Sequence, residues 1–340
     1  MPLGHSAPSN CVGYRQLPPP VSIINPANGL PLSEKDNTLA DADGNKYPII
    51  GGVPRICEPE NYTQNFGLQW NLFRATQLDR PEAGVELSAN RFFVETGWSP
   101  HELEGRDVLE VGSGAGRFTR AVLERTKARL WSIDYSNAVE ANLRNNGHIA
   151  PDRLRLFQAS IYEMPFPDNS FDKVFCLGVL QHTPDLEASI QSLLAKAKPG
   201  GEIVVDFYPI RGWWTKLNTK YFLRPITKRM AHDHLLGLIE RNIDWLMAAH
   251  HALTRIGLGV LTRFLPLADL RYMSPQGFTP EQMREWAVLD TFDMFSPEYD
   301  KPQRIARVSE IFRRRNAFVT FAGYVQVAGA RAAVVRAIKN

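Results

Sequence analysis

Short apolar runs alternate with amphipathic stretches through the middle of this chain. Runs typical of buried strands occupy 107–111, 130–134, 154–158, 173–177 and 203–207. Apolar residues recur at helical spacing between them, near 117–125, 138–145 and 186–196. This alternation predicts βαβ units and a parallel sheet with helices on both faces. The Lys-Pro-Gly-Gly sequence at 198–201 predicts a sharp stop before the fifth strand.

Residues 1–60 precede this core and predict an irregular arm. A Pro-Pro-Pro run and many Asn, Ser and Gly residues indicate a poorly ordered tail to about residue 45. A short hairpin is expected at 47–54. The core itself should span 61–210, beginning with helices at 61–78 and 84–97.

The regular alternation lapses after residue 210. A long helical insertion is expected at 211–300, and 301–340 should return to the sheet with a helix near 302–314 and strands near 318–324 and 331–336. The predicted fold class is α/β: a Rossmann-like, seven-stranded, mostly parallel sheet with a helical insertion after the fifth strand.

The composition, 44% hydrophobic and 22% charged residues, is that of an ordinary globular protein. A formal net charge of only +3 disfavours nucleic acid as a partner. Cys11, Cys57 and Cys176 form no CxxC pair, so neither a disulfide framework nor a zinc site is expected, and Cys176 reads as a core residue. The first ten residues do not resemble a signal peptide, and no apolar run is long enough to span a membrane. We expect a cytoplasmic protein.

A glycine-rich loop joins the first core strand to the following helix. Its sequence, Glu-Val-Gly-Ser-Gly-Ala-Gly, supplies the candidate ligand contacts Glu110, Gly112, Ser113, Gly114 and Gly116. Glycines let the backbone turn sharply and approach a ligand, and a helix start carries partial positive charge. Asp134 ends the second strand 22 residues after Gly112, where a carboxylate can accept ribose hydroxyls. The alternative is an Asp that caps the next helix.

A nicotinamide-dinucleotide enzyme would carry a similar loop. Its fingerprint, however, prefers Gly or Ala where this sequence has Arg117. Glu110 suits a ligand with an ammonium group, such as methionine. The dinucleotide interpretation is therefore the weaker one.

Five segments in order resemble the motifs of class I S-adenosylmethionine-dependent methyltransferases: 107–119, 131–136, 158–172, 180–185 and 198–201. The resemblance covers about residues 100–210 and is best to the small-molecule branch that includes quinone-biosynthesis methyltransferases. It extends less specifically to 66–79 and 290–300. S-adenosylmethionine is the cofactor that this resemblance implies.

The resemblance also implies roles for single residues. The glycine loop would hold the methionine end, Asp134 the ribose, and Ser160 with the Ile161 N–H the adenine, although the family usually places an Asp in this last segment. Tyr135 and Leu177 complete the expected cofactor contacts. Relatives often carry a cysteine-bound zinc ribbon near the N-terminus, whereas 24–29 has its turn without cysteines. No metal is predicted.

His182 is the candidate catalytic residue, because it follows the fourth strand, where it can remove a proton from an acceptor or orient it. A loop histidine bonded to backbone is the alternative. Other candidates, each with a packing or ion-pair alternative, are Asp206 and Tyr208 after the fifth strand, the carboxylates of 290–300, and Gln69, Trp70, Phe73 and Arg74 before the first.

The segment 211–229 contains six basic residues, no acidic ones and four interleaved aromatics. It predicts peripheral contact with an anionic membrane or a lid over a phosphorylated or lipid-linked acceptor, and equally a solvated basic helix face whose aromatics pack inward. Three functions remain open: methyl transfer to a small-molecule or lipid- or glycan-linked acceptor, methyl transfer to RNA, or a non-catalytic methyltransferase-like partner protein.

Overall fold

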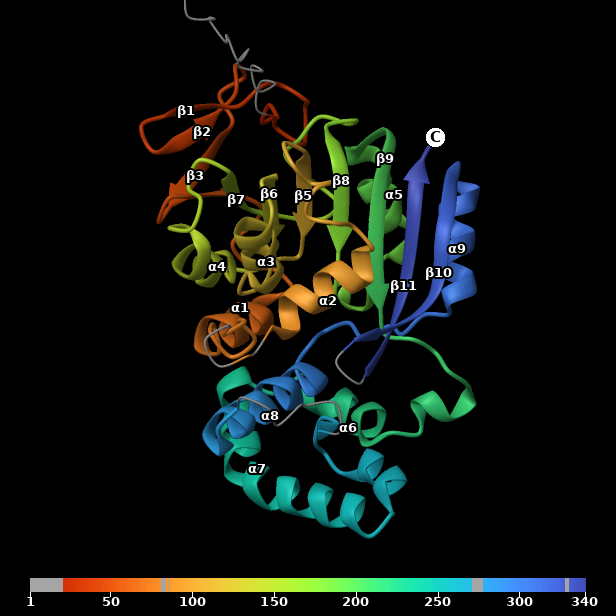
Figure 1. Ribbon diagram of the computed structural model, residues 1–340. Coiled ribbons are helices and arrows are strands. Elements are labelled where there is room, and N and C mark those ends of the chain that lie inside the picture. Colours follow the sequence, from red (N-terminus) through yellow and green to blue (C-terminus); the bar gives the residue numbers. More distant parts are fainter. Residues whose placement is uncertain (1–20, 81–83, 85, 271–277, 328–329) are drawn as a thin grey trace, which may run out of the picture.

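The computed structural model describes residues 21–80, 84, 86–270, 278–327 and 330–340. A central sheet dominates the fold (Figure 1). Seven of its strands lie in this spatial order: β7 (Leu154–Ala159), β6 (Arg129–Asp134), β5 (Asp107–Val111), β8 (Phe171–Cys176), β9 (Ala197–Phe207), β11 (Ala330–Lys339) and β10 (Ala317–Val327). The first five run parallel, β11 runs antiparallel to them, and β10 runs antiparallel to β11 and therefore in the direction of the first five. These seven match the expected strands closely.

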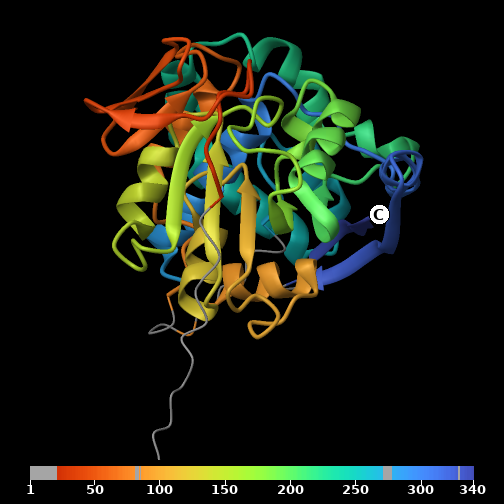
Figure 2. The ribbon, with the colours of Figure 1, turned by 90° about the horizontal axis from the view of Figure 1, so that it is seen from above.

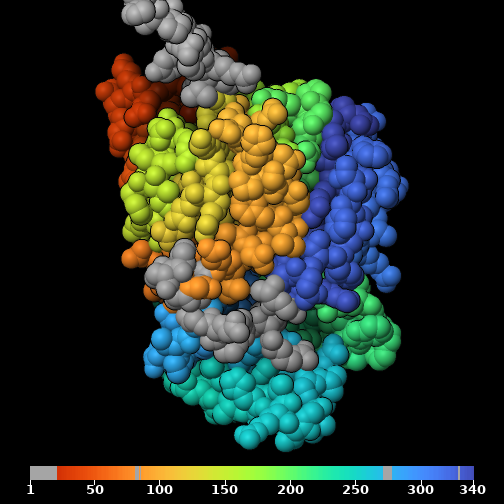
Figure 3. Space-filling model, in the orientation of Figure 1, coloured from red at the N-terminus to blue at the C-terminus, as the bar shows by residue number. Residues whose placement is uncertain are grey.

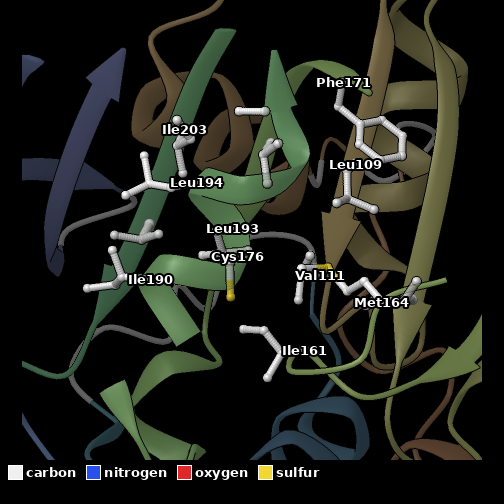
Figure 4. Packing of buried hydrophobic residues seen from close by; sticks show 14 of the residues in the cluster. Leu109, Val111, Ile161, Met164, Phe171, Cys176, Ile190, Leu193, Leu194 and Ile203 are labelled. Atoms are coloured by element: carbon white, nitrogen blue, oxygen red, sulfur yellow. The ribbon is translucent and has the colours of Figure 1, made fainter. Parts of the chain in front are cut away.

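Helices cover both faces of this sheet, as expected (Figure 2). One face carries α2 (Leu87–Thr96), α3 (Arg117–Arg125) and α4 (Val139–Asn146), and the other carries α5 (Leu186–Lys196) and α9 (Ile305–Arg314). Successive strand residues enter opposite cores, since Val108 packs with the first group and Leu109 with the second. Cys176 is fully buried in the second core, as predicted (Figure 4).

Among the described residues the sheet has eleven strands, so the expected number of seven is wrong. The arm before the core adds β1 (Ser33–Lys35), β2 (Thr38–Ala40), β3 (Lys46–Ile50) and β4 (Val53–Ile56). Strand β4 pairs in parallel with β7 and thereby covers what would otherwise be an exposed edge. The hairpin expected at 47–54 is confirmed as β3–β4, whereas strands replace the irregular chain expected at 33–40. Residues 1–20, including Cys11, lie outside the described residues.

A hydrogen-bonded pair of turns stands where the resemblance placed a zinc ribbon. Asp41 accepts hydrogen bonds from the side-chain amides of Asn25 at 2.6 Å, Asn45 at 2.8 Å and Asn28 at 2.9 Å. The bond from Asn25, more than any other interaction, lowers the pKa of Asp41. Amide–carboxylate bonds therefore close these turns.

The predicted stop at 198–201 is also wrong, because these residues lie inside β9. Phe171 is opposite Ala197, but Lys173 is opposite Glu202, so the residues between bulge out of register. Gly200, with a φ of +76°, permits this bulge. Pro and Gly therefore mark an irregular strand here.

The insertion lies beyond the carboxyl ends of the parallel strands (Figure 1). It contains η3 (Trp213–Lys216), α6 (Thr219–Thr227), α7 (His232–Arg255), η4 (Gly259–Phe264) and α8 (Pro280–Phe295). A third hydrophobic cluster joins α7 and α8 and includes Leu68 of α1 (Gln64–Leu72). This cluster attaches the insertion to the core domain. Among the described residues, none of the helices combines the length and apolar character needed to cross a membrane.

Candidate active site

The five parallel strands all end at one edge of the sheet, which we call the carboxyl edge. Ligands of open α/β sheets bind in the crevice outside this edge. The glycine loop follows β5 here, Asp134 ends β6, and Ser160 follows β7. Leu177 and Tyr208 come directly after β8 and β9. The structure thus brings the predicted site segments to one edge.

The glycine loop is tied to β6 by its own backbone. The N–H groups of Gly112 and Ser113 both donate to the Ile133 carbonyl, at 2.8 and 3.1 Å. The Gly114 N–H donates to Oδ2 of Asp134 at 2.8 Å, and the Gly116 N–H donates back to Ser113. These four N–H groups are therefore not free to bind a ligand. The loop offers a shaped surface more than a row of donors.

The glycines of the loop are required by packing within the protein. All three have positive φ, and a Cβ on Gly116 would lie 2.2 Å from Oδ1 of Asn142. A Cβ on Gly114 would lie 3.1 Å from Nε1 of Trp70. Trp70, on α1, thus lies against the loop, as one of the predicted aromatic candidates. Phe73 instead packs on the insertion's core.

Asp134, at the end of β6, accepts hydrogen bonds from the glycine loop and from Ser136. Its Oδ2 accepts the Gly114 N–H, and its Oδ1 accepts both the N–H and the hydroxyl of Ser136, at 2.8 and 2.6 Å. Burial raises its pKa. Each carboxylate oxygen retains lone-pair capacity, so a ribose contact at Asp134 stays a prediction.

Glu110 is buried between β5, β6 and α3. One oxygen accepts the hydroxyls of Thr119 and, at 2.8 Å, of Ser132. Burial raises the pKa of Glu110 to about 7. Its Oε1 has no hydrogen-bond partner within the described residues, and neither do Ser113 Oγ and Gln69 Oε1. Because such buried atoms are normally satisfied, they fit a site that takes a polar ligand.

The remaining predicted cofactor contacts differ in which of their atoms could still contact a cofactor. Ser160 is buried, and its hydroxyl accepts the Tyr162 N–H at 3.2 Å. The side chains of Ile161 and Leu177 pack in the two cores of the sheet, so only their backbones remain candidate contacts. Tyr135 stands edge-on to Tyr62, with ring centroids 5.4 Å apart.

His182 lies in η2 (Leu180–His182), directly beyond β8, and is buried. Its Nδ1 is 2.9 Å from the carbonyl oxygen of Tyr299. A carbonyl only accepts, so Nδ1 carries the proton and the neutral ring presents an unprotonated Nε2. Burial lowers the pKa of His182, which favours this neutral form. Phe66 and Tyr208 flank the ring edge-on, at 5.0 and 5.7 Å.

Most of the other predicted carboxylates form hydrogen bonds or ion pairs with neighbouring elements. Asp206 accepts the Gly178 N–H and receives a 2.6 Å bond from Arg91. Asp293 accepts the hydroxyl of Tyr208 at 3.2 Å. Asp290, whose pKa burial raises to about 7, accepts from the indole of Trp286 at 3.1 Å. Other pairs are Lys220 with Asp300, Lys228 with Glu298, and Arg74 with Asn145.

Gln181 is a candidate that the sequence interpretation missed. Its side chain is fully buried, yet neither its amide oxygen nor its amide nitrogen has a partner within the described residues. The only signal in the sequence is its place beside His182.

Comparison with known proteins identifies the family. A family profile described as a methyltransferase domain matches residues 109–205, from β5 to β9, including the glycine loop, Asp134 and His182. Residues 109–205 therefore match a class I S-adenosylmethionine-dependent methyltransferase domain. Its cofactor is S-adenosylmethionine.

Curated relatives of this methyltransferase differ in their acceptors. One is the tRNA U34 carboxymethyltransferase of Nautilia profundicola, 31% identical over 171 residues, which are 47% of this chain and 55% of the relative. Another is the malonyl-[acyl-carrier protein] O-methyltransferase of Halorhodospira halophila, 30% identical over 147 residues, 41% of this chain and 48% of the relative. The chain thus spans about half the length of these relatives.

Solved structures with a similar fold include the magnesium protoporphyrin IX methyltransferase of Synechocystis PCC 6803. That chain is 12% identical, with a TM-score of 0.40 over 71% of this chain and 73% of the other.

Proposed function

We propose that this methyltransferase transfers a methyl group from S-adenosylmethionine to a small-molecule or lipid-linked acceptor held beside His182. The observation that supports this proposal most directly is the set of buried polar atoms on Glu110, Ser113 and Gln69 that have no hydrogen-bond partner among the described residues. Buried polar atoms without partners are costly, and a bound amino acid and nucleoside would satisfy them.

The cofactor would lie along the carboxyl edge from β5 to β7. The glycine loop and Glu110 would hold its methionine part, Asp134 its ribose, and Ser160 with the Ile161 N–H its adenine. S-adenosylmethionine supplies an electrophilic methyl group together with its leaving group. The protein then has to align the acceptor and exclude water, and alignment alone contributes on the order of 7 kcal/mol.

His182 would accept the acceptor's proton at Nε2. Its Nδ1–H is held by the Tyr299 carbonyl, which fixes the tautomer and the ring orientation. The lowered pKa keeps the ring neutral near neutral pH. The aromatic rings of Phe66 and Tyr208 would shield the proton transfer from water.

RNA methylation is the second candidate. The relatives named tRNA U34 carboxymethyltransferases favour it, and the exposed Lys216 and Arg229 would suit a phosphate backbone. Such binding would weaken steeply with salt.

Transfer of labelled methyl groups into a cell extract tests the proposal. The extract is incubated with the purified protein and methyl-labelled S-adenosylmethionine, and is then separated into lipid, small-molecule, protein and RNA fractions. We expect label in the lipid or small-molecule fraction. Label confined to RNA would establish the second candidate, and a protein that binds the cofactor but labels no fraction would contradict the proposal.

A further inference from the structure

Exposed apolar side chains are concentrated in the insertion. Among the described residues, twelve of the seventeen exposed large hydrophobic side chains lie between 213 and 264. Trp213 is 79% exposed, Val260 64% and Phe264 53%. Scattered exposed apolar residues are normal, but a cluster of this kind indicates an interaction surface.

The insertion forms one end of the molecule (Figure 3), and its two short segments η3 and η4 are joined to each other. Arg263 of η4 donates a 2.6 Å hydrogen bond to the Trp214 carbonyl of η3. The Trp213 and Trp214 rings lie 6.1 Å apart, and η4 packs against α7. We call the resulting surface the apolar patch; it consists of Trp213, Trp214, Ile256, Val260, Leu261 and Phe264.

The charge around the apolar patch is entirely positive along the chain. No acidic residue occurs from 207 to 232 or from 245 to 268, the two stretches that supply the patch. Lys220 and Lys228 are used internally, in ion pairs with Asp300 and Glu298. Other exposed cations have no carboxylate partner within the described part of the chain: Arg211, Lys216, Arg229 and Arg255. An anionic surface would complement them.

We propose that this protein binds to an anionic membrane surface through the apolar patch. Tryptophan favours the level of the lipid headgroups, where its ring is buried and its N–H stays hydrated. The aliphatic side chains and Phe264 enter the boundary of the acyl chains, and Lys216 and Arg255 contact anionic headgroups. The contact lies in the plane of the membrane and needs no spanning helix.

A membrane fits this surface better than the other two macromolecular partners. Two copies of the chain meeting through the patch would bring like charges together, which is unfavourable. RNA would engage the cations and the tryptophans, but Ile256, Val260 and Leu261 offer it neither hydrogen bonds nor stacking. A lipid interface interacts favourably with the cations, the tryptophans and the aliphatic side chains of this surface.

Vesicle flotation of the full-length protein tests the proposal without any methyl transfer, so its outcome is independent of the acceptor. Vesicles of phosphatidylcholine alone are compared with vesicles containing equal parts of phosphatidylglycerol. We expect flotation with the anionic vesicles only, weakened by salt. The double variant Trp213→Ser/Phe264→Ser should lose it, and Lys216→Gln/Arg255→Gln should bind about 25-fold more weakly, since each basic residue contributes about five-fold.

Matched controls lie outside the patch. Phe318→Ser removes an equally exposed aromatic from β10, and Lys46→Gln removes an exposed cation from β3; both should float like the wild type. Unchanged thermal unfolding shows that each variant is folded. Equal flotation of patch variants and wild type, or no flotation at all, would overturn the proposal. Loss of self-association or of RNA binding in the same variants, without vesicle binding, would overturn it in favour of that partner.

Discussion

The carboxyl edge and the insertion satisfy their polar groups over different distances along the chain. At the carboxyl edge, Asp134 accepts hydrogen bonds from Gly114 and Ser136, 20 and 2 residues away. In the insertion, the Arg224 guanidinium donates to the Met294 and Pro297 carbonyls, the latter 73 residues away. The bonds of Asp134 thus join nearby segments of the core, whereas the insertion, like His182 in its contact with the Tyr299 carbonyl, is held by bonds between segments far apart in the sequence.

This difference separates the binding of the cofactor from the binding of the acceptor. The cofactor is common to the family, so the groups that hold it can be fixed by a short motif. The acceptor differs between relatives, and the insertion, which lies over the same edge, is the part free to vary with it. We therefore expect variants at the carboxyl edge to change cofactor binding, and variants in the insertion to change its attachment and acceptor access.

The largest expected effect is a loss of stability when a buried ion pair of the insertion is broken. Asp300 is almost completely buried and is paired with Lys220. Lys220→Met leaves this carboxylate with the longer contact to Arg224 Nε, at 3.9 Å, so the free energy of unfolding should fall by about 3 kcal/mol. Lys228→Met, at the C-cap of the same helix, is the control, because its partner Glu298 is 43% exposed, and it should cost less than about 1 kcal/mol. Urea unfolding measures both, and equal losses would contradict the importance of the buried pair.

The next effect is on turnover at His182. His182→Ala removes the proposed base, so turnover at saturating acceptor should fall about 100-fold, while the affinity for S-adenosylhomocysteine stays the same. Wild-type turnover should also fall as the pH drops through the lowered pKa of His182, because the protonated ring cannot accept a proton. His101→Ala, at an exposed site, is the control. Unaltered turnover of the His182 variant would exclude a required base.

The sequence predicted the carboxyl edge well because each of its groups is defined by position relative to a strand end. Helix α3 has the expected bounds, and the residues from Glu110 to Gly116 lie at the expected loop. The partners of the loop N–H groups were not predicted, because Gly112 and Ser113 donate to the backbone of Ile133, and Gly114 donates to Asp134, on the next strand.

Elsewhere the sequence carried less information. The pairing of β4 with β7 joins residues about a hundred positions apart, so no local sequence pattern predicts it. Gln181 belongs to no motif that would have singled it out, although its side chain is fully buried. The basic residues of 211–229 predicted an interaction surface, but only the structure shows that Lys220 and Lys228 are used internally.

A smaller effect is expected for the ribose contact. Asp134→Ala removes a charged acceptor, so the affinity for S-adenosylhomocysteine should fall about 30-fold by isothermal titration. The loop should also loosen, because Gly114 and Ser136 lose their acceptor. Asp152→Ala, in an exposed turn, changes the same charge without these contacts. Similar affinities for the two variants would reject the ribose assignment.

The smallest effect concerns the ionisation of Glu110, whose pKa burial raises to about 7. A ligand ammonium group favours the ionised carboxylate, so affinity for S-adenosylhomocysteine should rise about ten-fold between pH 6 and pH 8. In the free protein the sign is opposite: a raised pKa stabilises the fold at low pH, and this contribution is lost as the pH rises through about 7.

Glu110→Gln is the matched variant for both measurements, because it keeps the size of the side chain and removes the titration. His182 titrates in both proteins, so its contribution cancels in the comparison. We expect the variant's affinity and stability to vary less with pH than those of the wild type. If instead both proteins showed the same pH dependence of affinity, Glu110 would be a structural brace for Thr119 and Ser132, and the ammonium group would have to be held elsewhere at the carboxyl edge.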